Sequence, residues 1–157
     1  MESMTATHEH LLVRNMTSIA SDFVYEGQAA GTPLPPNVTE PLGLTRPADG
    51  AESPIHMSDN WIMPTATPVH WVDGHVHDYD EVLIWTGNDP DHPGDLGAVV
   101  RFEMDGVPCT STFTTSGSMF IPAGMPHCPL DFESVTRPFT CSARSLTSEY
   151  TKERAGA

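Results

Sequence analysis

Basic residues are scarce in this sequence. Only 7 of the 157 residues are Lys or Arg, against 21 Asp or Glu, and the formal net charge is −14. A surface this acidic repels phosphate backbones and anionic lipid, so we expect neither a nucleic-acid partner nor a membrane partner. Long apolar runs are also missing. No segment approaches the ~20 apolar residues of a membrane span, and MESMTATHEHLLVRNM lacks the continuous apolar stretch of a signal peptide.

Cysteine is rare too, and its spacing excludes the common thiolate metal sites. Cys109, Cys128 and Cys141 are odd in number and form no C-x-x-C pair. Free thiols in a reducing compartment are the simplest explanation, so the sequence predicts a cytoplasmic protein.

Helical periodicity is weak, while 15 prolines and 12 glycines indicate many turns. The length allows one domain with a sizeable core, and the composition favours an all-β domain with an extended arm. Residues 1–54 form the predicted N-terminal arm, with a weak helical pattern over 8–30 and a proline-rich extended segment from 31 onwards. That segment either crosses a surface, including that of a second subunit, or is a disordered linker. Residues 146–157 form a predicted C-terminal tail.

Short β-type runs recur over residues 55–145. They read IHMSDNWIM, TPVHWVD, EVLIWT, GAVVRFEM, VPCTSTFT, SMFIP and RPFTCSARSL, with turn signals between them. In RFEM-DG-VPCT the Asp-Gly pair predicts a two-residue hairpin. Short strands without helical patterns between them favour a sandwich or barrel. Because an open barrel leaves sheet edges to be covered, we also expect a homodimer.

The stretch GHVHDYDEVLIWTG concentrates titratable side chains directly before an apolar strand. His75 and His77 are two residues apart, so in a strand their side chains project from the same face. Glu81 opens the apolar run, and strand alternation places Leu83 and Trp85 on the same inner wall as Glu81. This spacing predicts a set of metal ligands that face the interior of a barrel.

A further ligand is expected from another strand, and GSMFIPAGMPHCPL offers His127 just after a bend enforced by proline and glycine. Three imidazoles with one carboxylate form an N/O ligand set that suits one divalent transition metal: Fe(II), which we favour, or Mn, Ni, Co or Zn. Four protein ligands on an octahedral metal leave two positions open, which favours a reactive site over a closed structural one.

Both stretches resemble the motifs of the cupin superfamily. The first family motif, H-x-H-x3-E followed by glycine, is matched by His75, His77 and Glu81, and the second, G-x-n-P-x-G-x2-H, ends at His127. The resemblance covers about residues 55–145 and implies a small double-stranded β-helix (jelly-roll) barrel with these four residues as metal ligands. Gly87 follows Glu81 one residue earlier than in the common form of the family, and no asparagine follows His127 at the usual distance.

Several other residues are candidates for the site. Tyr79 and Glu81 are the candidate catalytic residues, since Tyr79 lies between ligands and could donate a proton or hydrogen bond to substrate. We expect a substrate pocket formed by Leu83, Trp85, Met119 and Phe120.

Asp78 and Asp80 are candidates to accept the second N–H of metal-bound imidazoles, although both also suit a solvated turn. Trp71 and Trp61 are interpreted as packing residues. Cys128 is left out of the ligand set, because adjacent strand residues point to opposite faces.

Three functions fit such a site. The one we favour is a non-haem, Fe(II)-type oxygenase acting on a small apolar or aromatic compound that chelates the metal. A redox-neutral isomerase or lyase, with the metal as Lewis acid, is the second. A non-catalytic metal- or small-ligand-binding protein is the third, and the fold does not choose among them.

Overall fold

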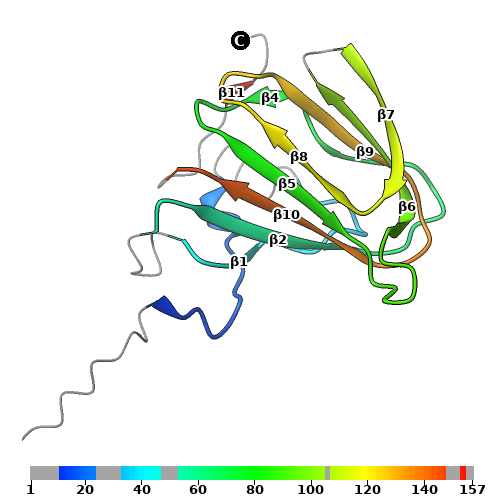
Figure 1. Cartoon of the computed structure of the whole chain (residues 1–157), viewed down its shortest axis with the longest axis horizontal. Helices are drawn as coiled ribbons and strands as arrows, with labels where there is room; N and C mark the ends of the chain where they lie inside the picture. The colour runs from blue at the N-terminus through cyan, green and yellow to red at the C-terminus, as the bar shows by residue number, and fades with distance from the viewer. Residues whose placement is uncertain (1–10, 24–32, 47–52, 105–106, 148–152, 155–157) are drawn as a thin grey trace, which may run out of the picture.

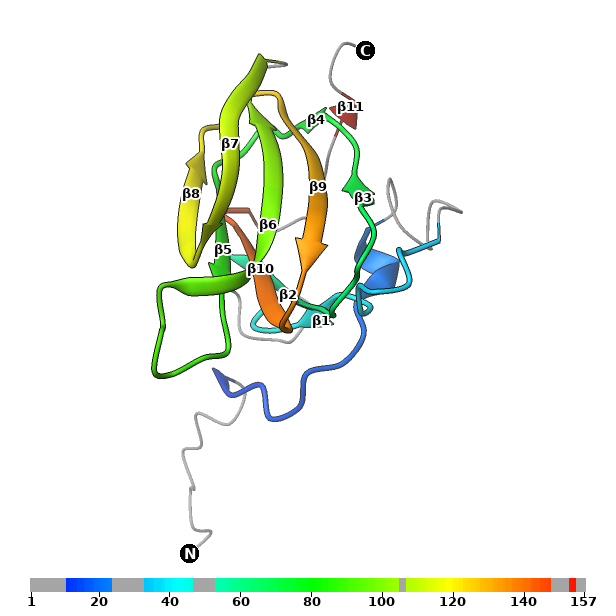
Figure 2. The same cartoon turned by 90° about the vertical axis from the view of Figure 1, so that its right-hand side faces the viewer.

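The computed structural model describes residues 11–23, 33–46, 53–104, 107–147 and 153–154. In these ranges eleven strands, β1 to β11, form two antiparallel sheets that surround a common interior (Figures 1 and 2). The all-β prediction is confirmed. Within the described ranges no helix is long and apolar enough to cross a membrane.

The first sheet has the strand order β1-β2-β10-β5-β8, and the second has the order β11-β4-β9-β6-β7, with β3 also pairing with β9. The strands of the first sheet are β1 (Leu42–Gly43), β2 (His56–Ile62), β10 (Phe139–Ser145), β5 (Glu81–Thr86) and β8 (Gly117–Ile121). Those of the second are β11 (Glu153–Arg154), β4 (His75–Val76), β9 (His127–Val135), β6 (Asp95–Met104), β7 (Val107–Thr115) and β3 (Val69–Val72). After β7 the chain alternates between the sheets, from β8 to β9 to β10, which joins the two layers into a barrel.

Strand β5 shows how the interior is filled. Its burial alternates residue by residue, with Glu81, Leu83 and Trp85 buried and the side chains between them less so. This is the alternation predicted from the sequence, because successive side chains of a strand point to opposite faces. The largest fully buried side chains include Phe102, Phe132 and Phe139, so aromatic residues from both sheets make up much of the core.

The strands expected from the sequence are found, and β6 pairs with β7 as an antiparallel hairpin with Met104 opposite Val107. The Asp-Gly turn itself lies outside the described residues. The strand expected to supply His127 is β9, which begins at His127 and runs to Val135.

The N-terminal part of the chain packs on its own barrel. Strand β1 pairs with β2, an isolated bridge joins Val38 to Ile62, and Val38 belongs to the hydrophobic core. In the described part of the predicted helical segment, residues 11–23, the one named helix is the short 3-10 helix η2 (Ala20–Asp22). A regular helix is therefore wrong for these residues. The rest of that segment, 8–10 and 24–30, lies outside the described residues.

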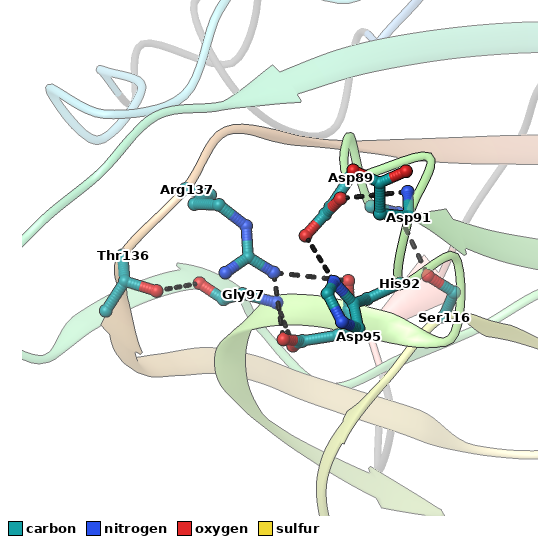
Figure 3. A network of polar contacts seen from close by, with 9 residues as sticks. Asp89, Asp91, His92, Asp95, Gly97, Ser116, Thr136 and Arg137 are labelled. Carbon is teal, nitrogen blue, oxygen red and sulfur yellow. Dashed lines mark hydrogen bonds and ion pairs between the residues drawn. The ribbon is translucent and has the colours of Figure 1, made fainter.

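The loop between β5 and β6 is fixed by a polar network at the end of β5 remote from Glu81 (Figure 3). Arg137 contacts the Asp95 carboxylate at 3.0 Å, and the Gly97 N–H donates to the same carboxylate at 2.9 Å. The Gly97 hydrogen bond, together with Arg137, holds the pKa of Asp95 below its ordinary value. Gly97 has a φ of 71°, a conformation that favours glycine. The network thus holds the start of β6 in place and is separate from the histidine motifs.

Candidate metal centre

The two histidine motifs meet at one end of the barrel. His75 lies in β4, His77 follows it directly, Glu81 opens β5 and His127 opens β9. His75 is paired with His127 across the β4–β9 ladder, so their side chains are direct neighbours. All four residues are at most 5% exposed.

The imidazoles of His75, His77 and His127 each offer a ring nitrogen, and these atoms all lie within 4.8 Å of one another. The Nε2 atoms of His75 and His77 are 3.1 Å apart. The Glu81 carboxylate lies beside them, 3.6 Å from Nε2 of His77 and 3.8 Å from Nε2 of His127. Two ligand atoms at right angles about a metal, each with a bond of about 2.1 Å, are separated by about 3.0 Å, so the His75–His77 distance fits shared coordination.

Backbone carbonyls orient two of the rings. Nδ1 of His75 donates to the Asp73 carbonyl at 2.8 Å, and Nδ1 of His127 donates to the Met125 carbonyl at 2.9 Å. A neutral imidazole with a proton on Nδ1 carries its lone pair on Nε2, the atom that faces the shared point. Lone pairs that face one another in a buried site are stabilised by a cation between them, so the residues present fit a divalent metal.

The orienting groups differ from those expected. For His75 and His127 they are backbone carbonyls and not the carboxylates of Asp78 or Asp80. Asp80 instead accepts a hydrogen bond from the Ala123 N–H at 2.9 Å, and this bond ties the segment before β5 to the bend before His127.

Ser145 holds the Glu81 carboxylate in place, a role that the sequence analysis did not predict. It is fully buried at the end of β10, is paired with Glu81 across the sheet, and donates its hydroxyl to Oε2 of Glu81 at 3.0 Å. Only the register of β10 against β5 brings the two residues together, and no local motif marks a serine as that partner.

Tyr79 is buried and lies against a predicted ligand. Its ring stacks on His77, with centroids 4.6 Å apart and an interplanar angle of 21°. Tyr79 does not line the cavity described below. Its role as a proton donor to substrate stays a prediction.

A cavity of about 70 Å³ opens beside the cluster, between β2 and β10 of one sheet and β3 and β9 of the other. His75, Glu81 and His127 form part of its wall. Of the predicted pocket residues, Leu83 lines this cavity and the other three do not.

Those three residues have other positions. Trp85 is buried deeper, against Phe102 and Phe113, and Met119 packs beside Leu83 in the β5–β8 pair. Phe120 is 56% exposed and is not part of this cavity wall; its role in a substrate pocket stays a prediction. Alternation accounts for this exposure, because Met119 shares the inner face of β8 and the next residue must point outward.

Trp71 has the packing role expected from the sequence, because it stacks on Phe132, and it also lines the cavity. Cys128 also lines it, although the adjacent His127 faces the same interior. Cys128 has a φ of 66°, a left-handed conformation that breaks the alternation of β9 and directs both side chains inward. The opposite wall carries Cys141, and burial strongly raises the pKa of its thiol, which keeps it protonated.

Neither a protein-family model nor a curated protein matches the chain. Similar solved structures include an uncharacterized conserved protein with a double-stranded β-helix domain from Klebsiella pneumoniae subsp. pneumoniae MGH 78578. It is 12% identical, over 79% of this chain and 91% of that one, with a TM-score of 0.47. KdgF from Halomonas sp. is 10% identical, over 71% of this chain and 81% of that one, with a TM-score of 0.44. An oxalate oxidase is 12% identical, over 92% of this chain and 72% of that one, with a TM-score of 0.47.

Similarity at this level concerns the fold and says nothing about the reaction. The chain supplies both histidine motifs, and its two antiparallel sheets bring those motifs together at one end of a barrel. Both features are what the resemblance of the two motifs to the cupin superfamily implies.

Proposed function

We propose that the protein is a metal-dependent enzyme, an Fe(II)-type oxygenase that acts on a small apolar or aromatic compound able to chelate the metal. The observation that carries this proposal is the buried His75–His77–His127 cluster with Glu81 beside it and an open cavity against it. A purely structural metal site has no need of a cavity at its ligands.

In this proposal, different residues would bind the metal, orient its ligands and line the substrate cavity. The three imidazoles and Glu81 hold the metal, which, when bound, supplies redox chemistry and a coordination site for a chelating group. The carbonyls of Asp73 and Met125 fix two of the rings, and Ser145 fixes the carboxylate. Leu83 and Trp71 line the cavity and offer apolar surface to a substrate with an apolar body.

Metal exchange in the protein separates the proposed reaction from its alternatives. An oxygenase needs a metal that changes its redox state, so we expect turnover with Fe(II), no turnover with Zn(II), and none under argon. The assay is oxygen uptake and product formation with enolic and phenolic compounds, using protein loaded with each metal in turn.

Turnover by the zinc form without oxygen would overturn the oxygenase proposal and favour an isomerase or lyase, since polarising an oxygen atom requires only charge and an open position. Metal binding without turnover of any tested compound would favour a non-catalytic ligand-binding protein.

A further inference from the structure

One wall of the cavity comes from outside the barrel strands. Among the described residues that line it, Phe23 alone precedes residue 55. Phe23 is 9% exposed and follows η2 directly. Its ring meets the edge of His56, with centroids 6.1 Å apart and an interplanar angle of 79°. An aromatic side chain from the N-terminal segment therefore closes part of a cavity whose other walls are barrel strands.

Ionic contacts hold this segment against the barrel. Oδ2 of Asp22 accepts hydrogen bonds from Arg46 at 2.8 Å and from Nε2 of His56 at 2.9 Å. Asp22 thereby connects the segment before β1, the segment after β1, and β2 itself. Burial opposes ionisation of Asp22, but the hydrogen bonds from His56 and Arg46 outweigh it and lower the pKa of the carboxyl group.

Backbone and core contacts add to this attachment. The Phe23 N–H donates to the Ala20 carbonyl at 3.2 Å, and the Ile19 N–H donates to the Pro41 carbonyl at 2.9 Å. The Ile19 side chain is 2% exposed. Backbone hydrogen bonds thus hold the chain both before and after η2. Phe23 is therefore held in a fixed position, as a permanent part of the cavity wall would be.

The charged residues that line the cavity limit the kind of ligand that it can bind. Among the described residues that line it, none is Lys or Arg, and Glu81 contributes a carboxylate. A compound with several negative charges would find no protein cation there. The ligand that fits has one metal-binding group, at most a single negative charge, and an apolar body.

We propose that Phe23 is a specificity-determining residue that limits the size of this apolar body, and that Asp22 is the positioning residue that holds it. The inference rests on the proposed function in taking the cavity ligand to be the substrate. Because Phe23 contacts the ligand's apolar end and not its chelating group, removing the ring enlarges the cavity while the ligand cluster stays as it is.

The main test uses cobalt-loaded protein and two hydroxamates that differ only in size. Acetohydroxamate and benzohydroxamate are titrated while the visible absorption of Co(II) is followed. Phe23→Ala should improve the affinity for benzohydroxamate relative to acetohydroxamate by about tenfold or more, the range of carbon-group discrimination in apolar pockets. Phe23→Leu should give a smaller shift of the same sign. Cobalt affinity, measured by chelator competition, should stay at the wild-type value in both variants.

Two further variants separate a wall from a merely structural residue. Leu12→Ala changes an exposed leucine of the same N-terminal segment and should leave the hydroxamate ratio unchanged. Asp22→Asn keeps the shape but weakens the ionic attachment, and should move the ratio in the same direction as Phe23→Ala. A ratio that stays within about twofold of wild type in Phe23→Ala would overturn the proposal.

A second experiment on the metal-free protein keeps this test independent of the proposed function. Xenon binding to the metal-free protein is followed by 129Xe NMR, and Phe23→Ala should increase the occupancy of the cavity. If cobalt does not bind at all, the proposed function fails while the xenon result still decides whether Phe23 is a wall. Equal xenon occupancy in wild type and Phe23→Ala would overturn the assignment of that wall.

Discussion

Replacement of Ser145 by alanine tests whether Glu81 is a metal ligand held in place by its neighbour. The hydroxyl donates to a buried carboxylate at 3.0 Å, and Ser145 itself is 0% exposed. A hydrogen bond to a charged group contributes about 1.5–3 kcal/mol, so Ser145→Ala should lower the free energy of unfolding of the metal-free protein by about that amount. Without the bond the carboxylate loses a group that orients it, and loss of such a group typically weakens metal affinity by about 10–100-fold.

The assay is competition between the protein and a fluorescent chelator for Co(II), with urea unfolding of the metal-free forms alongside. Ser142→Ala is the matched control, because Ser142 lies on the same strand and its hydroxyl donates to the Ser58 carbonyl at 3.1 Å, away from Glu81. The control should lose some stability and keep its cobalt affinity. Cobalt affinity in Ser145→Ala within about twofold of wild type, or an equal loss in the control, would refute the reasoning.

The remaining predictions concern the ligands, pH and association. Glu81→Ala should weaken metal binding less than His75→Ala, because three imidazoles remain; chelator competition with both variants checks the order. Partial burial alone would lower the pKa of His70, but hydrogen bonds to Asp131 and Asp73 outweigh it and raise that pKa. The two hydrogen bonds of protonated His70 therefore stabilise the fold at pH values below its ordinary pKa of about 6.5. This stabilisation is lost as the pH rises through the higher pKa that His70 has in the folded protein. Urea unfolding across that range should show the loss in wild type and a flatter profile in His70→Asn, and equal profiles would contradict this assignment. We also propose a homodimer that covers edge strand β8, where Phe120 is 56% exposed. Light scattering should then give twice the chain mass for wild type and the chain mass for Phe120→Glu, and a wild-type monomer would reject the dimer.

Local spacing explains which parts of the site could be predicted. A period of two along β5 places Glu81, Leu83 and Trp85 on one face whatever the rest of the chain does, and they are buried together. The same rule could not locate the cavity. It opens toward β2, β3, β9 and β10, on the side of the ligand cluster where Trp71 lies, and the wall expected on β8 is not part of it.

The residues missed from the sequence depend on register and on an unusual backbone conformation. Ser145 meets Glu81 only through the pairing of β10 with β5. Cys128 faces inward because of its positive φ, and nothing in the letters HCPL marks that break in alternation. Phe23 reaches the cavity through contacts of Asp22 with Arg46 and His56, which are distant in the chain. Such long-range contacts carry no local periodic signal.

X-ray absorption on protein loaded with one equivalent of Co(II) tests the metal centre most directly. The ligand set of His75, His77, Glu81 and His127 predicts a shell of nitrogen and oxygen only, with the multiple-scattering signature of three imidazoles. His127→Ala should lose that signature for one ring together with most of the bound cobalt. A sulfur atom in the shell, which would implicate Cys128, or full cobalt occupancy in His127→Ala, would contradict the account.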